Sequence, residues 1–227
     1  MNRKLDPLMC KQSDRFIKER DYGEYGWRIW KRLGKSKSQK EADAYAFLAK
    51  QGLPAPRVYR VEDKRNALGI LTYSRLEIEQ LDAVDLRYIM YQDEYLPLRS
   101  NRVWRRALIE RLAQDLRLMH EHRFFHLNLN FRNIMVVPDV DRIPPTIYYI
   151  DATSARFSPF PWELHHCLVK ELAFLYRDSR PFFSHTERLH FLHCYLGRDR
   201  LTPSDKAFAA AIVRYTKKKW GDKVSTL

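Results

Sequence analysis

Cysteine is scarce in this 227-residue sequence, and its three cysteines, Cys10, Cys167 and Cys194, are widely scattered. Their odd number and wide spacing match neither a disulfide framework nor the paired cysteines of a zinc site. We therefore expect a protein of a reducing compartment.

Long apolar runs are also missing. The N-terminus has no apolar segment of signal-peptide length, and the longest uncharged apolar run is far shorter than a membrane span. These absences predict a protein that is cytoplasmic or bound peripherally to a membrane surface. A hydrophobic content of 45% is sufficient for a core, and the length fits one large domain or two small lobes.

Positive charge is abundant, and the formal net charge is +13 at pH 7. Such a charge predicts an anionic partner: a nucleic acid, a nucleotide or an acidic membrane surface. It does not choose among them, because most of the basic residues taken singly fit solvated helix faces. No nucleic-acid-binding motif is present, so we do not expect a nucleic acid as the partner.

The most informative stretch runs from residue 124 to 151. Two apolar runs, 134–137 and 147–150, flank a turn that is rich in proline and aspartate. This pattern predicts a β-hairpin, whose two ends lie side by side. Asn133 precedes it and Asp151 follows it, and an amide oxygen beside a carboxylate suits Mg²⁺. The alternative is a surface hairpin with ordinary polar turn residues.

The sequence pattern of the N-terminal part predicts a second hairpin, with strands at 16–19 and 27–31. Gly23 and Gly26 lie at its tip, where glycine lets backbone N–H groups approach a phosphate. The signal for a phosphate loop is weak, because the three-glycine pattern is absent. Lys31 ends the second strand, where a kinase holds its phosphate-contacting lysine. The alternative for Lys31 is a solvent-facing strand lysine.

A helix is predicted over 39–51, where apolar residues recur with helical periodicity and Gly52 supplies a stop. Glu41 lies near its start, from where it can reach Lys31 and hold the lysine over the phosphates. An acidic residue in the first turn also favours the helix by itself. Both interpretations stand together.

We expect an α+β fold of two parts. The first, residues 1–78, is a small antiparallel sheet with one helix, and it includes strands at 57–61 and 68–73. The second, residues 79–227, is mostly helical. Periodicity and capping residues predict its helices at 81–91, 103–120, 162–177, 186–196 and from Thr202 onward.

His190 and His193 share one face of the predicted helix 186–196. We expect no acidic or cysteine partner beside them to complete a zinc site. The pattern favours core packing or hydrogen bonds at the helix end.

The sequence His126-Leu-Asn128-Leu-Asn-Phe-Arg-Asn133 resembles the phosphotransferase loop His-x-Asp-x-x-x-x-Asn, which precedes a strand that ends in a metal-binding aspartate. From about Trp27 onward the chain resembles the lipopolysaccharide kinase family, the Kdo and heptose kinases that include InaA-type proteins. The resemblance rests on residues 29–32, 40–56, 126–133, 149–156 and 188–197.

This resemblance implies a two-lobed, protein-kinase-like fold with ATP and Mg²⁺ as ligands. It implies as acceptor an inner-core sugar of lipopolysaccharide or a related glycolipid. Such an acceptor is assembled at the inner face of the bacterial cytoplasmic membrane, which fits a basic, peripheral protein.

The resemblance also implies roles for individual residues. Lys31 would contact the nucleotide phosphates, and Glu41 would pair with it. Asn133 and Asp151 would bind Mg²⁺, and His126 would brace the loop.

Asn128 departs from the family pattern, because the family's catalytic aspartate belongs at this position. An amide does not serve as a general base, although it can orient the acceptor hydroxyl. Phosphoryl transfer depends mostly on positioning and charge stabilisation, so the substitution is compatible with activity. The alternative is a kinase-fold pseudoenzyme that binds a nucleotide or a partner in an envelope-stress response.

Overall fold

The computed structural model describes residues 14–23 and 30–221. Contacts divide the chain into two compact units. The first comprises Met1–Ala42 and Pro56–Leu81, and the second comprises Asp43–Ala55 and Asp82–Leu227. The second unit therefore includes residues 43–55, which the predicted division at residue 78 places in the first part. The fold is α+β and protein-kinase-like.

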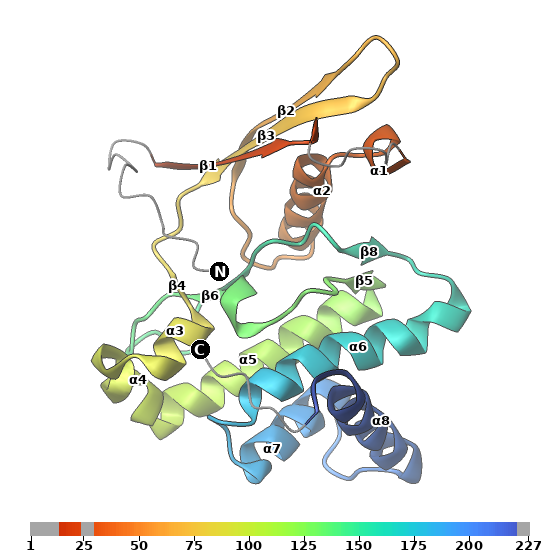
Figure 1. Cartoon of the computed structure of the whole chain (residues 1–227). Coiled ribbons are helices and arrows are strands. Elements are labelled where there is room, and N and C mark those ends of the chain that lie inside the picture. The colour runs from red at the N-terminus through yellow and green to blue at the C-terminus, as the bar shows by residue number, and fades with distance from the viewer. Residues whose placement is uncertain (1–13, 24–29, 222–227) are drawn as a thin grey trace. The chain divides into compact units, whose positions relative to one another are not determined.

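The first unit is built on a three-stranded antiparallel sheet in the order β1-β3-β2 (Figure 1). Its strands are β1 (Arg15–Asp21), β2 (Val58–Arg65) and β3 (Leu71–Glu79). β3 lies in the centre and buries more of its residues than either edge strand, as a strand with two neighbours does.

The hairpin predicted between 16–19 and 27–31 is not seen in the described residues. β1 pairs with β3 instead, in a register that runs from Arg15 opposite Glu79 to Asp21 opposite Tyr73. Residues Trp30–Leu33 form the short helix α1, and residues 27–29 lie outside the described ranges. Strand pairing joins segments that are distant in sequence, and the alternation of residues 27–31 carried no information about β1's partner.

Helix α2 (Lys37–Lys50) agrees with the prediction, and Gly52 follows it with a φ of 74°, a left-handed value that glycine adopts without strain. Near its start, Ser36 Oγ accepts a hydrogen bond from Gln39 N at 2.9 Å. The first half of α2 belongs to the first unit and the second half to the second unit.

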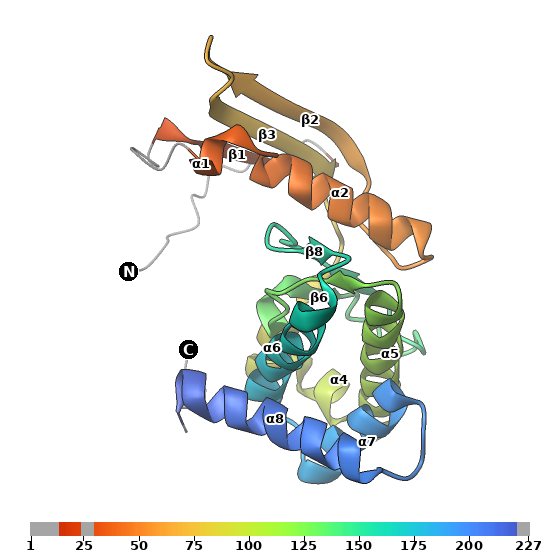
Figure 2. The same ribbon diagram turned by 90° about the vertical axis from the view of Figure 1, so that its right-hand side faces the viewer.

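Four helices form the bulk of the second unit: α5 (Arg102–Glu121), α6 (Pro161–Ser179), α7 (His185–Leu196) and α8 (Pro203–Trp220). Helix α7 packs against α5, and α8 packs against α6 (Figures 1 and 2). The predicted helices therefore form. Helices α5 and α6 bury an apolar stripe, whereas Tyr195 is the one buried residue of α7.

Capping residues set the bounds of the last two helices. Ser184 and Glu187 form a capping box at the start of α7, which ends at Gly197 with a φ of 65°. Thr202 and Asp205 form a second capping box, which starts α8. None of the helices within the described ranges is long and apolar enough to cross a bilayer.

The central hairpin consists of β6 (Ile134–Val136) and β7 (Ile147–Tyr149), paired from Ile134 opposite Tyr149 to Val136 opposite Ile147. β4 (Val84–Asp85) pairs with the other edge of β6, which shortens the helix predicted over 81–91. That helix, α3, begins only after Asp85, whose side chain caps it. The remaining elements are α3 (Leu86–Tyr91), η2 (Asp93–Tyr95), α4 (Leu96–Ser100), β5 (Phe124–Phe125), η3 (Phe131–Asn133) and β8 (Arg156–Phe157).

Candidate active site

The first unit holds a buried ion pair between its sheet and its helix. Glu41, on the second turn of α2, is fully buried, and its carboxylate contacts Lys18 and Arg20 of β1. Lys18 Nζ lies 2.5 Å from Glu41 Oε1, and Arg20 Nη2 lies 2.9 Å from Glu41 Oε2. Residues two apart on a strand point to the same face. Two cations therefore share one carboxylate, which leaves a positive charge at this place.

A strand lysine paired with a helix glutamate is the arrangement that the sequence assigned to Lys31. The structure shows it at Lys18. Lys31 lies in α1, so the prediction that it ends a strand is wrong. The structure does not describe its side chain, and its pairing with Glu41 stays a prediction. The sequence carries little signal for Lys18, because residues 15–21 do not alternate in polarity. The half-buried face of β1 that includes Lys18 appears only in the structure.

The two glycines of the predicted phosphate loop have different outcomes. The Gly23 N–H donates to Asp21 Oδ1 at 2.7 Å, which places a carboxylate where a phosphate was expected. Gly26 lies outside the described residues. A phosphate-binding role for either glycine stays a prediction.

In the second unit, polar side chains gather around Asn128. Asn133 Nδ2 donates to the backbone carbonyl oxygen of Asn128 at 2.8 Å. Asn128 Nδ2 donates to Asp151 Oδ2 at 3.3 Å, and Asn130 Nδ2 donates to the Asn128 carbonyl at 3.1 Å. The structure therefore brings Asn128, Asn133 and Asp151 into one small volume, although they are up to 23 positions apart in the sequence.

The hairpin explains why Asn133 and Asp151 are neighbours. The antiparallel ladder continues beyond the strands, where Ile150 N donates to the Asn133 carbonyl at 2.9 Å. Asp151 then leaves the strand with a φ of 57°, in the left-handed region. Aspartate tolerates this conformation better than most residues, and such values recur at functional sites. The Asp151 N–H points to the Tyr45 hydroxyl at 3.4 Å.

His126 links the start of the loop 126–133 to the end of β7. Its side chain is fully buried, and Nε2 donates to the Ile150 carbonyl at 2.9 Å. This bond ties the start of the loop to the residue before Asp151. A side chain placed in this way holds the two segments at a constant separation.

The oxygen atoms around Asn128 fit a hard divalent cation. Asn133 uses its amide nitrogen on the Asn128 carbonyl, so its Oδ1 is the atom left to act as a ligand. Asp151 supplies a carboxylate next to it. An amide oxygen and a carboxylate, with no sulfur or imidazole, are ligands that suit Mg²⁺.

Two buried carboxylates on α6 hold the loop 126–133 through its backbone N–H groups, and neither was predicted from the sequence. Glu171 Oε2 accepts a hydrogen bond from Leu127 N at 2.7 Å, and Asp178 Oδ2 accepts one from Phe131 N at 3.0 Å. Leu127 has a φ of 58°, which is unfavourable for leucine, and the bond to Glu171 helps to hold it there. The signal was two acidic residues seven positions apart on the apolar face of a predicted helix.

Glu171 is itself held by further buried polar side chains. His120 Nε2 lies 3.3 Å from Glu171 Oε1, and His120 Nδ1 lies 2.7 Å from the Tyr195 hydroxyl. Burial, followed by the charge of Glu171, raises the pKa of Tyr195, so its hydroxyl stays protonated and can donate to His120. A buried chain of polar contacts thus connects α7 through α5 and α6 to the loop backbone.

Comparisons with known proteins point to one family. The model of the lipopolysaccharide kinase (Kdo/WaaP) family matches residues 26–195. Among solved structures, "WaaP in complex with acyl carrier protein" superposes with a TM-score of 0.67 at 20% sequence identity. The match covers 91% of this chain and 80% of that one, and at this identity it shows the fold alone. No curated protein sequence is a significant match to the chain.

Proposed function

Because the chain belongs to the lipopolysaccharide kinase (Kdo/WaaP) family, we propose that it transfers a phosphate from ATP to a sugar hydroxyl of a lipopolysaccharide core or a related glycolipid. The observation that carries the proposal is the convergence of Asn128, Asn133 and Asp151 at the end of the central hairpin. Asn133 and Asp151 are the residue types that a phosphotransferase uses to bind its metal, and Asn128 lies at the position that faces the acceptor.

The proposal assigns the phosphate contact to Lys18. Glu41 holds the Lys18 ammonium at 2.5 Å, as the helix glutamate of a kinase holds its strand lysine. Arg20 shares the same carboxylate, so the Lys18 charge is only partly neutralised and remains available to an anionic ligand. This proposal differs from the assignment that the sequence favoured, which gave the phosphate contact to Lys31.

Asn133 and Asp151 would hold Mg²⁺ through oxygen atoms. When bound, the ion neutralises charge on the phosphate oxygens. His126, Glu171 and Asp178 are positioning residues. They hold the loop 126–133 and the end of β7 in place through hydrogen bonds to backbone atoms.

Asn128 positions the acceptor hydroxyl without removing its proton. Its carboxamide oxygen accepts a hydrogen bond from a hydroxyl group, but it does not take up a proton at neutral pH. The loss of a general base lowers a rate by about 10²–10⁴-fold. The chain would therefore be a slower kinase than relatives that carry aspartate at this position.

Phosphate transfer from labelled ATP to a purified lipopolysaccharide core, with Mg²⁺ present, tests the proposal. The intact chain should label the core, and Asp151→Ala should abolish labelling together with the Mg-ATP-dependent rise in Tm. Asp139→Ala is the matched control, because Asp139 is an exposed aspartate in the turn of the same hairpin. An intact chain that binds Mg-ATP and core but transfers no phosphate contradicts the kinase assignment.

A second candidate function, a nucleotide-binding pseudoenzyme of the envelope-stress response, is favoured by the contact between Asn128 Nδ2 and Asp151 Oδ2. This contact occupies a carboxylate oxygen that the metal would need. On this alternative, Asn128→Asp creates transfer activity where the intact chain has none, while ATP binding is unchanged. Measurable turnover by the intact chain decides against it.

We also propose that the chain works at the inner face of the cytoplasmic membrane, where a lipopolysaccharide core is assembled. Its net charge of +13 supports attraction to anionic lipid headgroups.

A further inference from the structure

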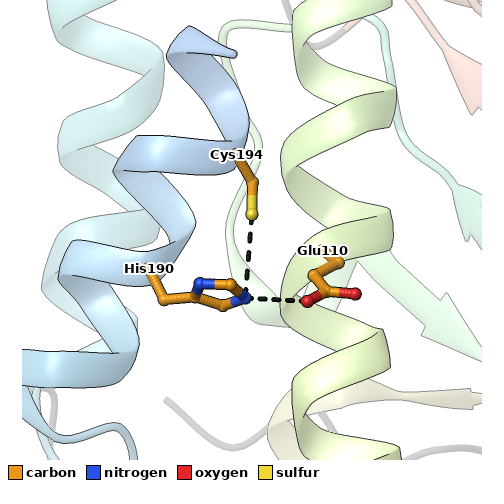
Figure 3. A group of neighbouring side chains, drawn as sticks. All are labelled: Glu110, His190 and Cys194. Carbon is orange, nitrogen blue, oxygen red and sulfur yellow. Dashed lines mark hydrogen bonds and ion pairs between the residues drawn. The ribbon is translucent and has the colours of Figure 1, made fainter. Parts of the chain in front are cut away.

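Three metal-binding side chains meet between α5 and α7, away from the polar group around Asn128. Figure 3 shows Glu110 of α5 facing His190 and Cys194 of α7. His190 Nε2 lies 2.9 Å from Glu110 Oε1 and 3.7 Å from Cys194 Sγ. One ligand atom from each residue lies within 4.8 Å of the other two.

The sequence predicted no such group, and that prediction is wrong. His190 and Cys194 are four residues apart, so they lie one turn apart on the same face of α7. Glu110 is 80 positions away in sequence, and only the packing of α7 on α5 places it opposite them. His193, the other histidine considered, turns away and contacts the Arg198 carbonyl.

We propose that Glu110, His190 and Cys194 bind a divalent ion of the zinc class. A thiolate, an imidazole and a carboxylate together form a ligand set typical of zinc rather than of magnesium or calcium. Three protein ligands leave the fourth tetrahedral position to a water molecule.

The distances between the ligand atoms support this assignment. Metal–ligand bonds of about 2.0–2.3 Å place the donor atoms of a tetrahedral zinc site about 3.3–3.8 Å apart. The contact of 3.7 Å between Sγ and Nε2 already lies in this range. The contact of 2.9 Å between Nε2 and Oε1 is a hydrogen bond, which must open by about half an ångström to admit the ion.

The contact between Arg106 and Glu110 is weak enough for a metal ion to replace it. Arg106 Nε also contacts Glu110 Oε1 at 2.9 Å, but the Arg106 side chain is 72% exposed, and exposed pairs contribute little. Hydrogen bonds from Arg106 and then His190 lower the pKa of Glu110. Burial and the Glu110 charge raise the pKa of Cys194, so binding must displace a thiol proton.

An ion has a path to the group. The Glu110 and His190 side chains are about one-third exposed, at 35% and 33%. Cys194 also lines a polar cavity of about 500 Å³ beside α5, together with Gln114 and Arg117. The site is therefore accessible from solvent without unfolding of either helix.

A bound ion would link α7 to α5 next to the polar contacts of Tyr195, His120 and Glu171. Tyr195 directly follows Cys194, and its hydroxyl contacts His120, which in turn contacts Glu171. The expected effect is on the stability of the α5–α7 packing, because none of the three ligands touches the residues proposed to bind substrate.

The test uses the full chain, freed of metal with a chelator and titrated with Zn²⁺ and, separately, with Co²⁺. We expect about one Zn²⁺ per chain, a rise in Tm on zinc addition, and a thiolate-to-cobalt charge-transfer band in the Co²⁺ complex. Cys194→Ser should remove the band and His190→Gln should abolish the zinc-dependent rise in Tm. His193→Gln, on the same helix but outside the group, should keep both.

Cys10 and Cys167 remain in the Cys194→Ser variant, so a band of unchanged intensity there assigns the metal to another thiol and overturns the proposal. Zinc binding well below one per chain in the intact protein also overturns it. The Tm values of the metal-free variants show whether each is folded, and a folded variant without the zinc response supports the site.

Discussion

At the scale of single residues, the informative contrast is between Lys18 and Lys31. Both precede Glu41, and the sequence favoured Lys31 because it ends the alternating run 27–31, where a kinase holds its phosphate-contacting lysine. The contact of 2.5 Å with Glu41 is made by Lys18, from a strand whose alternating face directs it toward α2. A pairing across two elements depends on which face each residue occupies, and sequence spacing alone does not report this.

This contrast gives a residue-scale prediction. Under the proposed function, Lys18→Met should lower kcat/KM by about 10²–10³-fold, because it removes the charge assigned to the phosphate contact. Glu41 keeps Arg20 as a partner in this variant, so the fold should persist. Initial rates at saturating and limiting ATP provide the measurement.

The matched variant is Lys31→Met, which we expect to keep most of the activity. A large loss in Lys31→Met with little change in Lys18→Met would return the phosphate contact to Lys31.

At the scale of elements, the central hairpin is held from two sides. On one side α6 supports the loop through Glu171 and Asp178. On the other, the Tyr149 hydroxyl of β7 donates to Asp115 of α5 at 2.8 Å, and Arg111 contacts the same carboxylate at 2.8 Å. Burial raises the pKa of Asp115, and the Arg111 charge opposes that shift. These contacts fix β7, and therefore the place where Asp151 leaves it.

The element-scale prediction concerns Tyr149, which is fully buried. Tyr149→Phe should lower the free energy of unfolding by about 1–3 kcal/mol, because Asp115 loses a hydrogen-bond donor in a buried place. Urea denaturation monitored by circular dichroism provides the measurement.

Tyr148→Phe serves as the control, because Tyr148 lies on the half-buried face of the same strand. Its effect should stay within about 0.5 kcal/mol. Equal losses in the two variants would show that the contact with Asp115 does not anchor the strand.

At the scale of the whole molecule, the dominant property is the net charge of +13. Basic residues close to an anionic bilayer each contribute about 1 kcal/mol to binding at moderate salt.

The corresponding prediction is measured by co-sedimentation with lipid vesicles. Vesicles with an anionic lipid fraction should retain the protein at low salt, and raising the salt concentration to about 1 M should release it as charges are screened. Neutral vesicles should not retain it. Retention that is equal on both kinds of vesicle, or insensitive to salt, would contradict an electrostatic attachment.

The local features of the fold were readable from the sequence. Periodicity predicted α2, α5, α6, α7 and α8, and the capping residues placed their ends within a few positions. The central hairpin was equally predictable, because its apolar runs and turn chemistry are adjacent in the chain. Helices and hairpins depend on contacts between near neighbours, so a short stretch contains most of the information that specifies them.

The sequence by itself therefore determined the family, the central hairpin and the identities of Asn128, Asn133 and Asp151. Only the tertiary structure decided which strand pairs with β1, that Lys18 contacts Glu41, which carboxylates hold the loop, and that Glu110 faces His190 and Cys194. Each of these joins residues that lie 23 or more positions apart in the sequence. Such contacts follow from how whole elements pack, and no local pattern encodes the partner.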